Sequence, residues 1–223
     1  MENSELLKLV EEIKECKGFK LESDLKNLEL SFKLMVINYG YVEHILKNVR
    51  SFSVNEGDEK DKLMMEATRS FVNYLSSAGA LRDHTRKFIR KTYGSDQNAF
   101  EGEYSKKIKE EFSDDPLSQL IEALRNHYCH IGIPPLGIQT KIVNGTYESK
   151  FVVFLEDIDL KQSPKAKKYV RNSDEKIADV LTLAEKYTHK SIFPWIIRTI
   201  SEKHKKDFDY LNFLRSKADE LRK

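Results

Sequence analysis

The stretch DPLSQLIEALRNHYCH, residues 115–130, predicts one amphipathic helix with a defined start, end and core-facing side. Asp115 is a preferred N-cap residue, and Pro116 fits the first position of a helix. Gly132 and the pair Pro134-Pro135 then stop the helix. The apolar residues recur at helical spacing and predict one buried face, which consists of Leu117, Leu120, Ile121, Leu124 and Tyr128.

The chain before this helix is also predicted to be helical. Apolar residues at helical spacing predict a helix over Leu6–Ile13 that ends at Lys17-Gly18, and a longer helix from Leu25 to Val49. Residues 51–57 form a predicted polar loop, a third long helix runs from about residue 58 to Gly94, and residues 104–111 are helical.

After Pro135 the pattern changes from helical to alternating. Two alternating segments, Ile138–Val143 and Tyr147–Leu155, flank Asn144-Gly145, which is a strong signal for a two-residue hairpin turn. A polar, lysine-rich linker is expected at residues 162–168, followed by one helix over residues 174–187 and another over residues 194–221. The predicted fold class is therefore mainly α: one domain over residues 1–223, a helical bundle with an inserted hairpin within residues 136–160 and additional C-terminal helices within residues 173–223.

Composition limits the kinds of protein that this chain can be. Hydrophobic residues make up 39% of the 223 residues, which is enough for a buried core. The formal charge of +2 excludes bulk electrostatic adhesion to nucleic acid and leaves local basic patches. The first fifteen residues do not resemble a secretory signal, no apolar run is long enough to cross a membrane, and two cysteines make no disulfide framework. We expect a cytoplasmic protein with no membrane partner.

Arg125, Asn126 and His130 form a set that can cleave RNA without a metal or another cofactor. A guanidinium can hold the charge of a phosphate, and an imidazole can move a proton to or from a ribose hydroxyl near neutral pH. On an ideal helix, Asn126 and His130 lie about 40° apart, but Arg125 lies about 140° from His130 and about 7.5 Å away along the axis. One copy of the chain does not bring the set together, so we expect a homodimer in which two such helices meet across a two-fold axis.

Other interpretations of this stretch remain open. Arg125 fits an ordinary surface arginine, and a histidine in a last helical turn complements the helix dipole. His127, Cys129 and His130 are metal-ligand types, but no further ligand stands at suitable spacing nearby, so we expect no metal. Cys129 as a nucleophile beside His130 is disfavoured because adjacent helix positions point about 100° apart, and a packed or semi-buried thiol is the expectation.

The third helix carries a second candidate set. Arg82, Arg86 and Arg90 stand four residues apart and form a stripe that could follow a phosphate backbone. The alternative is a solvated face, supported by an expected pair between Asp83 and Lys87. His84 fits a hydrogen-bonded packing residue. Together with His127 of the motif helix, the three arginines are the candidate RNA-binding residues.

An arginine, four intervening residues and a histidine on a late helix, preceded by a long helix, resembles the HEPN domain, the higher eukaryotes and prokaryotes nucleotide-binding superfamily. Arg125, Asn126 directly after it, and His130 match the signature in spacing and polarity. The resemblance covers residues 24–135, and the stretches 73–74 and 82–86 are also similar to a segment of bacterial HEPN-like proteins.

The resemblance implies a metal-independent endoribonuclease, often a toxin or defence effector, that works as a dimer. His130 would be the general acid or base, Arg125 would steady the pentacoordinate phosphate, and Asn126 would orient the ribose or His130. The chain has Gly132 where one branch of the family has a tyrosine that an antitoxin modifies, so that modification is not expected. The resemblance implies RNA as the partner, with an antitoxin or other protein as a further candidate partner. The alternative function is a noncatalytic helical module that binds nucleic acid, a nucleotide or a protein.

Overall fold

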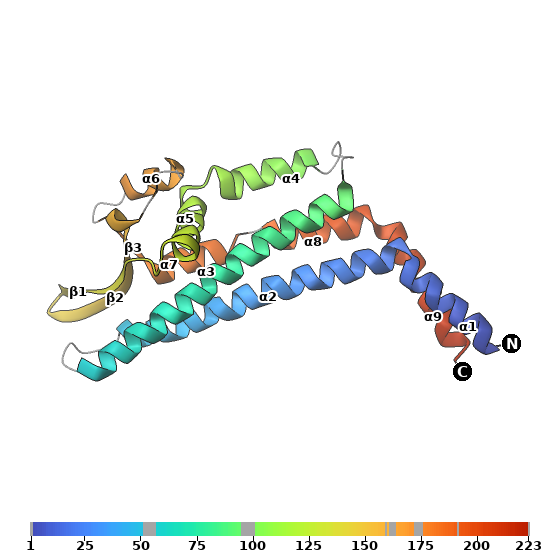
Figure 1. Ribbon diagram of the computed structural model, residues 1–223, viewed down its shortest axis with the longest axis horizontal. Helices are drawn as coiled ribbons and strands as arrows, with labels where there is room; N and C mark the ends of the chain where they lie inside the picture. Colours follow the sequence, from blue (N-terminus) through green and yellow to red (C-terminus); the bar gives the residue numbers. More distant parts are fainter. Residues whose placement is uncertain are drawn as a thin grey trace.

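The computed structural model is mainly helical, with one small antiparallel sheet (Figure 1). It describes residues 2–50, 57–94, 101–158, 160, 164–171, 176–190 and 192–222. In chain order the elements are α1 (Glu2–Glu15), α2 (Lys17–Arg50), α3 (Gly57–Tyr93), α4 (Glu101–Ile108), a π-helical turn (Lys109–Ser113), α5 (Pro116–His130), β1 (Leu136–Val143), β2 (Thr146–Phe154), a 3-10 turn (Leu155–Asp157), α6 (Pro164–Arg171), β3 (Ile177–Asp179), α7 (Val180–Thr188), α8 (Ile192–Lys203) and α9 (Lys205–Glu220).

The frame of the molecule is a long antiparallel hairpin of α2 and α3 (Figure 1). Apolar residues recur at helical spacing in both helices, so each helix turns one apolar side toward the other. These side chains form one buried core together with residues of α5, β2 and α7. Tyr74 of α3 is fully buried there, and its hydroxyl donates to the carbonyl of Ala184 at 3.0 Å and lies 3.0 Å from Thr188 Oγ1. A second buried cluster, around Leu28, Phe88 and Ile196, packs α8 against the first half of α2 and the second half of α3.

The first predicted helix boundary is displaced. Lys17 and Gly18 do not stop a helix; the chain bends at Cys16, and both residues lie in the first turn of α2. A side chain at Gly18 would come within 2.2 Å of the Asp207 carbonyl oxygen. The glycine therefore permits close contact between the start of α2 and α9 rather than ending a helix.

The predicted hairpin is confirmed. Strands β1 and β2 pair in antiparallel register from Leu136↔Val153 to Val143↔Thr146, and Asn144 and Gly145 have φ values of 51° and 78°, as a two-residue turn of this hand requires. The sheet also contains β3, which pairs with the end of β2 through Val153↔Ala178. Of the helix predicted over residues 174–187, residues 174 and 175 lie outside the described residues, Ile177–Asp179 are the strand β3, and the helix α7 begins at Val180.

The C-terminal part differs from the prediction in two further places. Residues 164–168, predicted as a linker, form the first part of α6, which packs on α5. The single helix expected over residues 194–221 is two helices, α8 and α9, with His204 between them. The predicted loop at residues 51–57 lies almost wholly outside the described residues. None of the described helices is both long enough and apolar enough to span a lipid bilayer.

Helices α1 and α9 lie side by side at the end of the molecule that carries both termini (Figure 1). An ion pair fixes α9 to α2: Arg215 Nη1 and Nη2 donate to Glu22 Oε1 and Oε2 at 3.0 and 2.7 Å. The hydrogen bonds from Arg215 lower the pKa of Glu22 from 4.5 to about 2, against the opposing effect of burial.

This pair makes stability depend on pH in acid. Because the folded-state pKa of Glu22 is depressed, its contribution is present above pH 4.5 and is lost as the pH falls toward 2. We expect Glu22→Gln to lower the free energy of unfolding by about 1 kcal/mol at pH 7, since both partners are partly exposed and solvent screens them. Urea unfolding at several pH values should show this difference shrinking toward zero in acid. Glu29→Gln, which removes the exposed pair with Lys33, is the control; a difference that stays constant down to pH 2 would contradict the assignment.

Candidate nucleic-acid interface

The start of α5 is fixed by the cap that its sequence predicts. Pro116 occupies the first turn, and the Asp115 carboxylate accepts hydrogen bonds from the Ser118 backbone N–H at 2.9 Å and from its hydroxyl at 2.8 Å. Lys190 pairs with the same carboxylate at 2.8 Å. Burial alone would raise the pKa of Asp115, but the hydrogen bonds from Lys190 and Ser118 outweigh it and hold the pKa below its usual range. The cap therefore stays charged at neutral pH and anchors the helix.

The buried face of α5 is rotated slightly from the predicted one. Leu120 and Leu124 are fully buried as predicted, but Tyr128 is 36% exposed and His127 takes the inward position, with 9% exposure. Within the described residues, His127 Nδ1 is buried without a hydrogen-bond partner. The structure places His127 on the inner side of α5, away from the exposed Asn126 and His130, and its role as an RNA contact stays a prediction.

Arg125 lies against α3 beside two residues that fix its position. Its Nη2 donates to Asp83 Oδ2 at 3.3 Å, and its side chain is 26% exposed. A Cβ atom at Gly79, one turn before Asp83, would come within 2.3 Å of Arg125 Nε. The absence of a side chain at Gly79 leaves room for the Arg125 side chain, and the Asp83 carboxylate orients its guanidinium.

Asn126 and His130 are exposed on the outer side of α5. Among the described residues, His130 makes no hydrogen bond or ion pair, whereas Arg125 is turned toward Asp83. A single chain therefore leaves the arginine and the histidine on separate parts of the helix surface. Cys129 is exposed too, so the expectation of a packed or semi-buried thiol is wrong.

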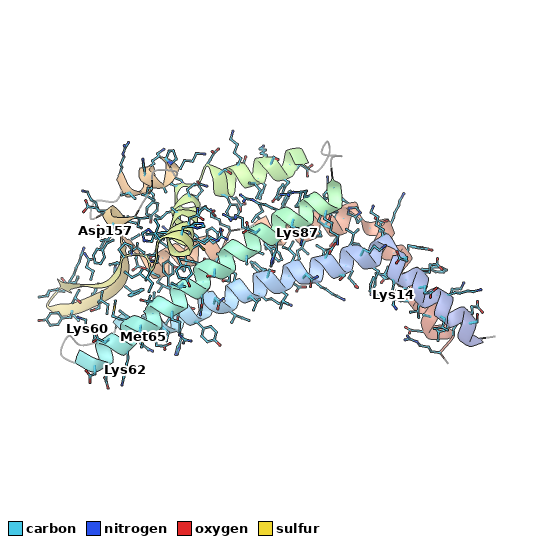
Figure 2. All side chains as sticks on the ribbon, in the orientation of Figure 1. Lys14, Lys60, Lys62, Met65, Lys87 and Asp157 are labelled. Carbon is cyan, nitrogen blue, oxygen red and sulfur yellow. The ribbon has the colours of Figure 1, made fainter. Side chains whose placement is uncertain are left out.

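The arginine stripe on α3 is not a uniform cationic face. Arg82 is only 17% exposed and pairs with Asp83 at 2.8 Å and with Glu122 of α5. Arg86 and Arg90 remain exposed. Asp83 contacts Arg82, Arg86 and Arg125 instead of pairing with Lys87, which stands on an exposed part of α3 (Figure 2).

His84 is hydrogen-bonded as expected. Its Nδ1 lies 2.7 Å from the hydroxyl of Ser31, which is a buried residue of α2, although the His84 ring itself is exposed. The contact ties α3 to α2, and we assign His84 no chemical role.

Glu122, Gly79 and Asp83 are the site residues that sequence reasoning missed. Gly79 and Asp83 stand four residues apart and therefore lie on one face of α3, which is the only sequence signal that relates them. Glu122 stands three residues before Arg125, and its carboxylate forms an ion pair with Arg82. The four side chains Arg82, Asp83, Glu122 and Arg125 make an electrostatic contact between α3 and α5 that fixes the motif helix.

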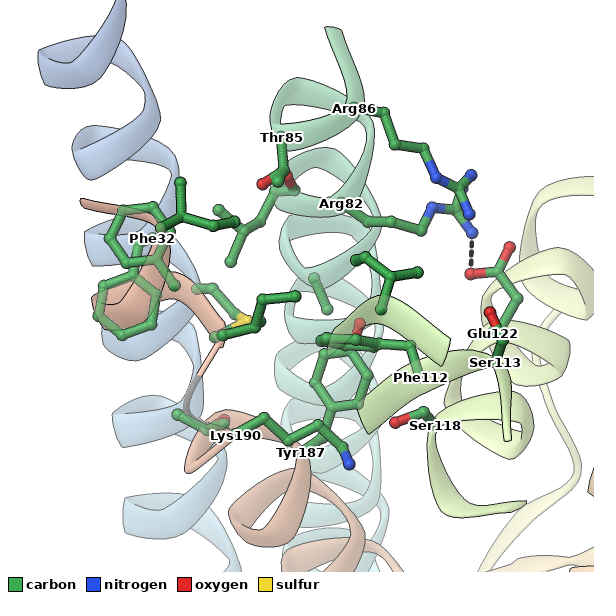
Figure 3. Close-up of a pocket in the computed structure, with 18 of the residues that line it drawn as sticks. Phe32, Arg82, Thr85, Arg86, Phe112, Ser113, Ser118, Glu122, Tyr187 and Lys190 are labelled. Atoms are coloured by element: carbon green, nitrogen blue, oxygen red, sulfur yellow. Dashed lines mark hydrogen bonds and ion pairs between the residues drawn. The ribbon is translucent and has the colours of Figure 1, made fainter. Parts of the chain in front are cut away.

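A pocket of about 240 Å³ adjoins this contact (Figure 3). It lies among α2, α3, α4, the π-helical turn, α5 and the segment from α7 to α8. Arg82, Arg86 and Glu122 line it, whereas Arg125, Asn126 and His130 do not.

Within the described part of the chain, histidine, cysteine and carboxylate side chains form no group of three or more suited to a metal ion. Compared with models of known protein families, with curated proteins and with solved structures, the chain matches none of them.

Proposed function

We propose that the chain is a metal-independent endoribonuclease of the HEPN type, whose site forms when two copies pair along α5. The observation that carries the proposal is that α5 exposes Asn126 and His130 on its outer side, while Asp83 holds the Arg125 guanidinium in one orientation on another part of the same helix. An arginine fixed by a carboxylate still has N–H donors to offer, and a solvent-facing imidazole can exchange protons.

The exposed surface around the motif supports pairing. Tyr128, Ile131 and Ile133 are 36%, 63% and 64% exposed, and they lie in the last turn of α5 and directly after it. Large apolar side chains gathered at one place favour contact with another protein surface. A two-fold contact here would bring the Arg125 of one copy toward the His130 of the other, which the single chain keeps apart.

The chemistry is an in-line displacement on RNA. The ribose 2′-oxygen attacks the adjacent phosphorus, the bond to the 5′-oxygen breaks, and the proton lost from the 2′-hydroxyl is balanced by one given to the 5′-oxygen. His130 moves one or both of these protons, Arg125 stabilises the charge on the pentacoordinate phosphate, and Asn126 orients the ribose or His130. Arg86 and Arg90 are the exposed members of the stripe, and we assign them to backbone phosphates; Arg82 is engaged by Glu122.

The proposal is tested with purified protein and a labelled single-stranded RNA in EDTA. We expect internal cleavage despite the chelator, because the proposed displacement needs no metal ion. The products should carry a 2′,3′-cyclic phosphate and a 5′-hydroxyl, because the attacking 2′-oxygen stays bonded to phosphorus and the 5′-oxygen leaves. End-group analysis by mass spectrometry reads the products. RNA that remains intact, or cleavage that EDTA abolishes, would reject the proposal.

A further inference from the structure

The pocket beside α5 has the composition of a ligand site. Its volume of about 240 Å³ is far larger than the roughly 10–15 Å³ that one water molecule requires. Apolar side chains make most of its wall; the charged side chains Arg82, Arg86 and Glu122 gather at one part of it, and Lys190 lies at another (Figure 3). This combination is typical of sites for small organic molecules.

Flat aromatic rings form a substantial part of the apolar wall. Phe32 of α2 and Phe193 of α8 are stacked with 4.3 Å between centroids, and Phe112 meets Tyr187 edge to face at 5.6 Å. Tyr104 adds a further ring, and the other apolar side chains of the wall are aliphatic: Met35, Ala78, Leu81, Ile108, Ile192 and Ile196. Planar aromatic walls favour a planar apolar body, which can stack on one ring and meet the edge of another.

The charged side chains of the wall and the side chains linked to them through ion pairs include one more cation than carboxylates. Arg82 is engaged by Glu122 and Asp83, and Lys190 is engaged by Asp115 while its Nζ lies 5.6 Å from the Phe112 centroid. Asp83 is shared further with Arg125 at 3.3 Å and with Arg86 at 4.0 Å. Figure 3 shows Arg82 and Arg86 reaching from α3 toward the same part of the pocket as Glu122. The Arg86 side chain, 55% exposed, is thus the cation that lacks a close carboxylate of its own.

We propose that this pocket binds a small aromatic monocarboxylate, with the ring between the aromatic walls and the carboxylate on Arg86. A guanidinium and a carboxylate can form two parallel hydrogen bonds, and one cation without a close carboxylate of its own suits a ligand with one negative charge. None of the proposed cleavage residues Arg125, Asn126 and His130 lines the pocket, which shares only Arg86 with the residues that we assign to RNA phosphates. Binding is measured without RNA and stands whether or not the protein cleaves RNA.

The experiment titrates the full-length protein with 1-naphthoate by isothermal titration calorimetry. The neutral 1-naphthamide has the same ring system and serves as the matched probe. We expect the acid to bind at least tenfold more tightly than the amide, and Arg86→Gln to weaken binding of the acid at least tenfold. Arg90→Gln removes an exposed arginine one turn further along α3 that does not line the pocket, so it should leave binding unchanged.

Three outcomes would overturn the inference: no heat of binding for the acid, equal affinity for acid and amide, or equal losses in the two arginine variants. Because Arg86 is exposed, its replacement leaves the core intact, and a circular dichroism spectrum identical to that of the wild type verifies this.

Discussion

His130→Ala is expected to reduce the rate of RNA cleavage by about 10²–10⁴-fold, the usual contribution of a general acid or base. The imidazole is exposed and makes no contact that holds α5 in place, so its removal should not change the fold. The rate of appearance of cyclic-phosphate ends on single-stranded RNA measures the effect. Arg125→Ala should lower the cleavage rate by about 10²–10³-fold in the same assay, because it removes the donor that we propose stabilises the phosphate.

The matched control for His130 is His44→Ala, which removes an exposed histidine of α2. Its cleavage rate should equal that of the wild type, and circular dichroism should show the same helix content in all three variants. If His130→Ala cleaves as fast as His44→Ala, the imidazole takes no part in the reaction.

Gly79→Ala should separate activity from stability. An added Cβ displaces the Arg125 side chain, whose Nε would lie 2.3 Å away, so cleavage should fall by about 10²-fold, as in Arg125→Ala. Alanine nevertheless favours the helix over glycine by roughly 0.5–1 kcal/mol, which offsets part or all of the cost of that displacement. The expected result is a protein of near wild-type unfolding free energy that has lost most of its cleavage.

Gly40→Ala is the comparison for this variant. Gly40 also lies inside a helix, but a Cβ there meets nothing within 4 Å. Urea unfolding of this variant should show a free energy of unfolding higher than that of the wild type by the difference in helix propensity between alanine and glycine. Its RNA cleavage rate should equal that of the wild type. Equal cleavage by the two alanine variants would show that the close contact between Gly79 and Arg125 does not position a catalytic group.

Features encoded over a few neighbouring residues could be predicted from the sequence. Asp115-Pro116 caps α5 as its residue types require, and Asn144-Gly145 forms the expected turn because both residues tolerate positive φ. The long α2 and α3 helices follow from apolar spacing sustained over many turns.

Features that depend on contacts between distant segments could not be predicted. His127 and Tyr128 stand three and four residues after Leu124, about 60° and 40° from it around the helix, so spacing alone does not decide which of them faces inward. Strand β3 is three residues long and exists through its pairing with β2. The engagement of Arg82 by Glu122 likewise depends on how α5 lies on α3.

The central claim is that the cleavage site is composed of groups from two copies of the chain. Arg125→Ala and His130→Ala are each expected to be inactive alone, but a mixed dimer would hold one intact site, with Arg125 from one subunit and His130 from the other. After unfolding, mixing in equal amounts and refolding, about half of the dimers are mixed, so about a quarter of wild-type cleavage should return. A mixture no more active than either variant alone would contradict the account.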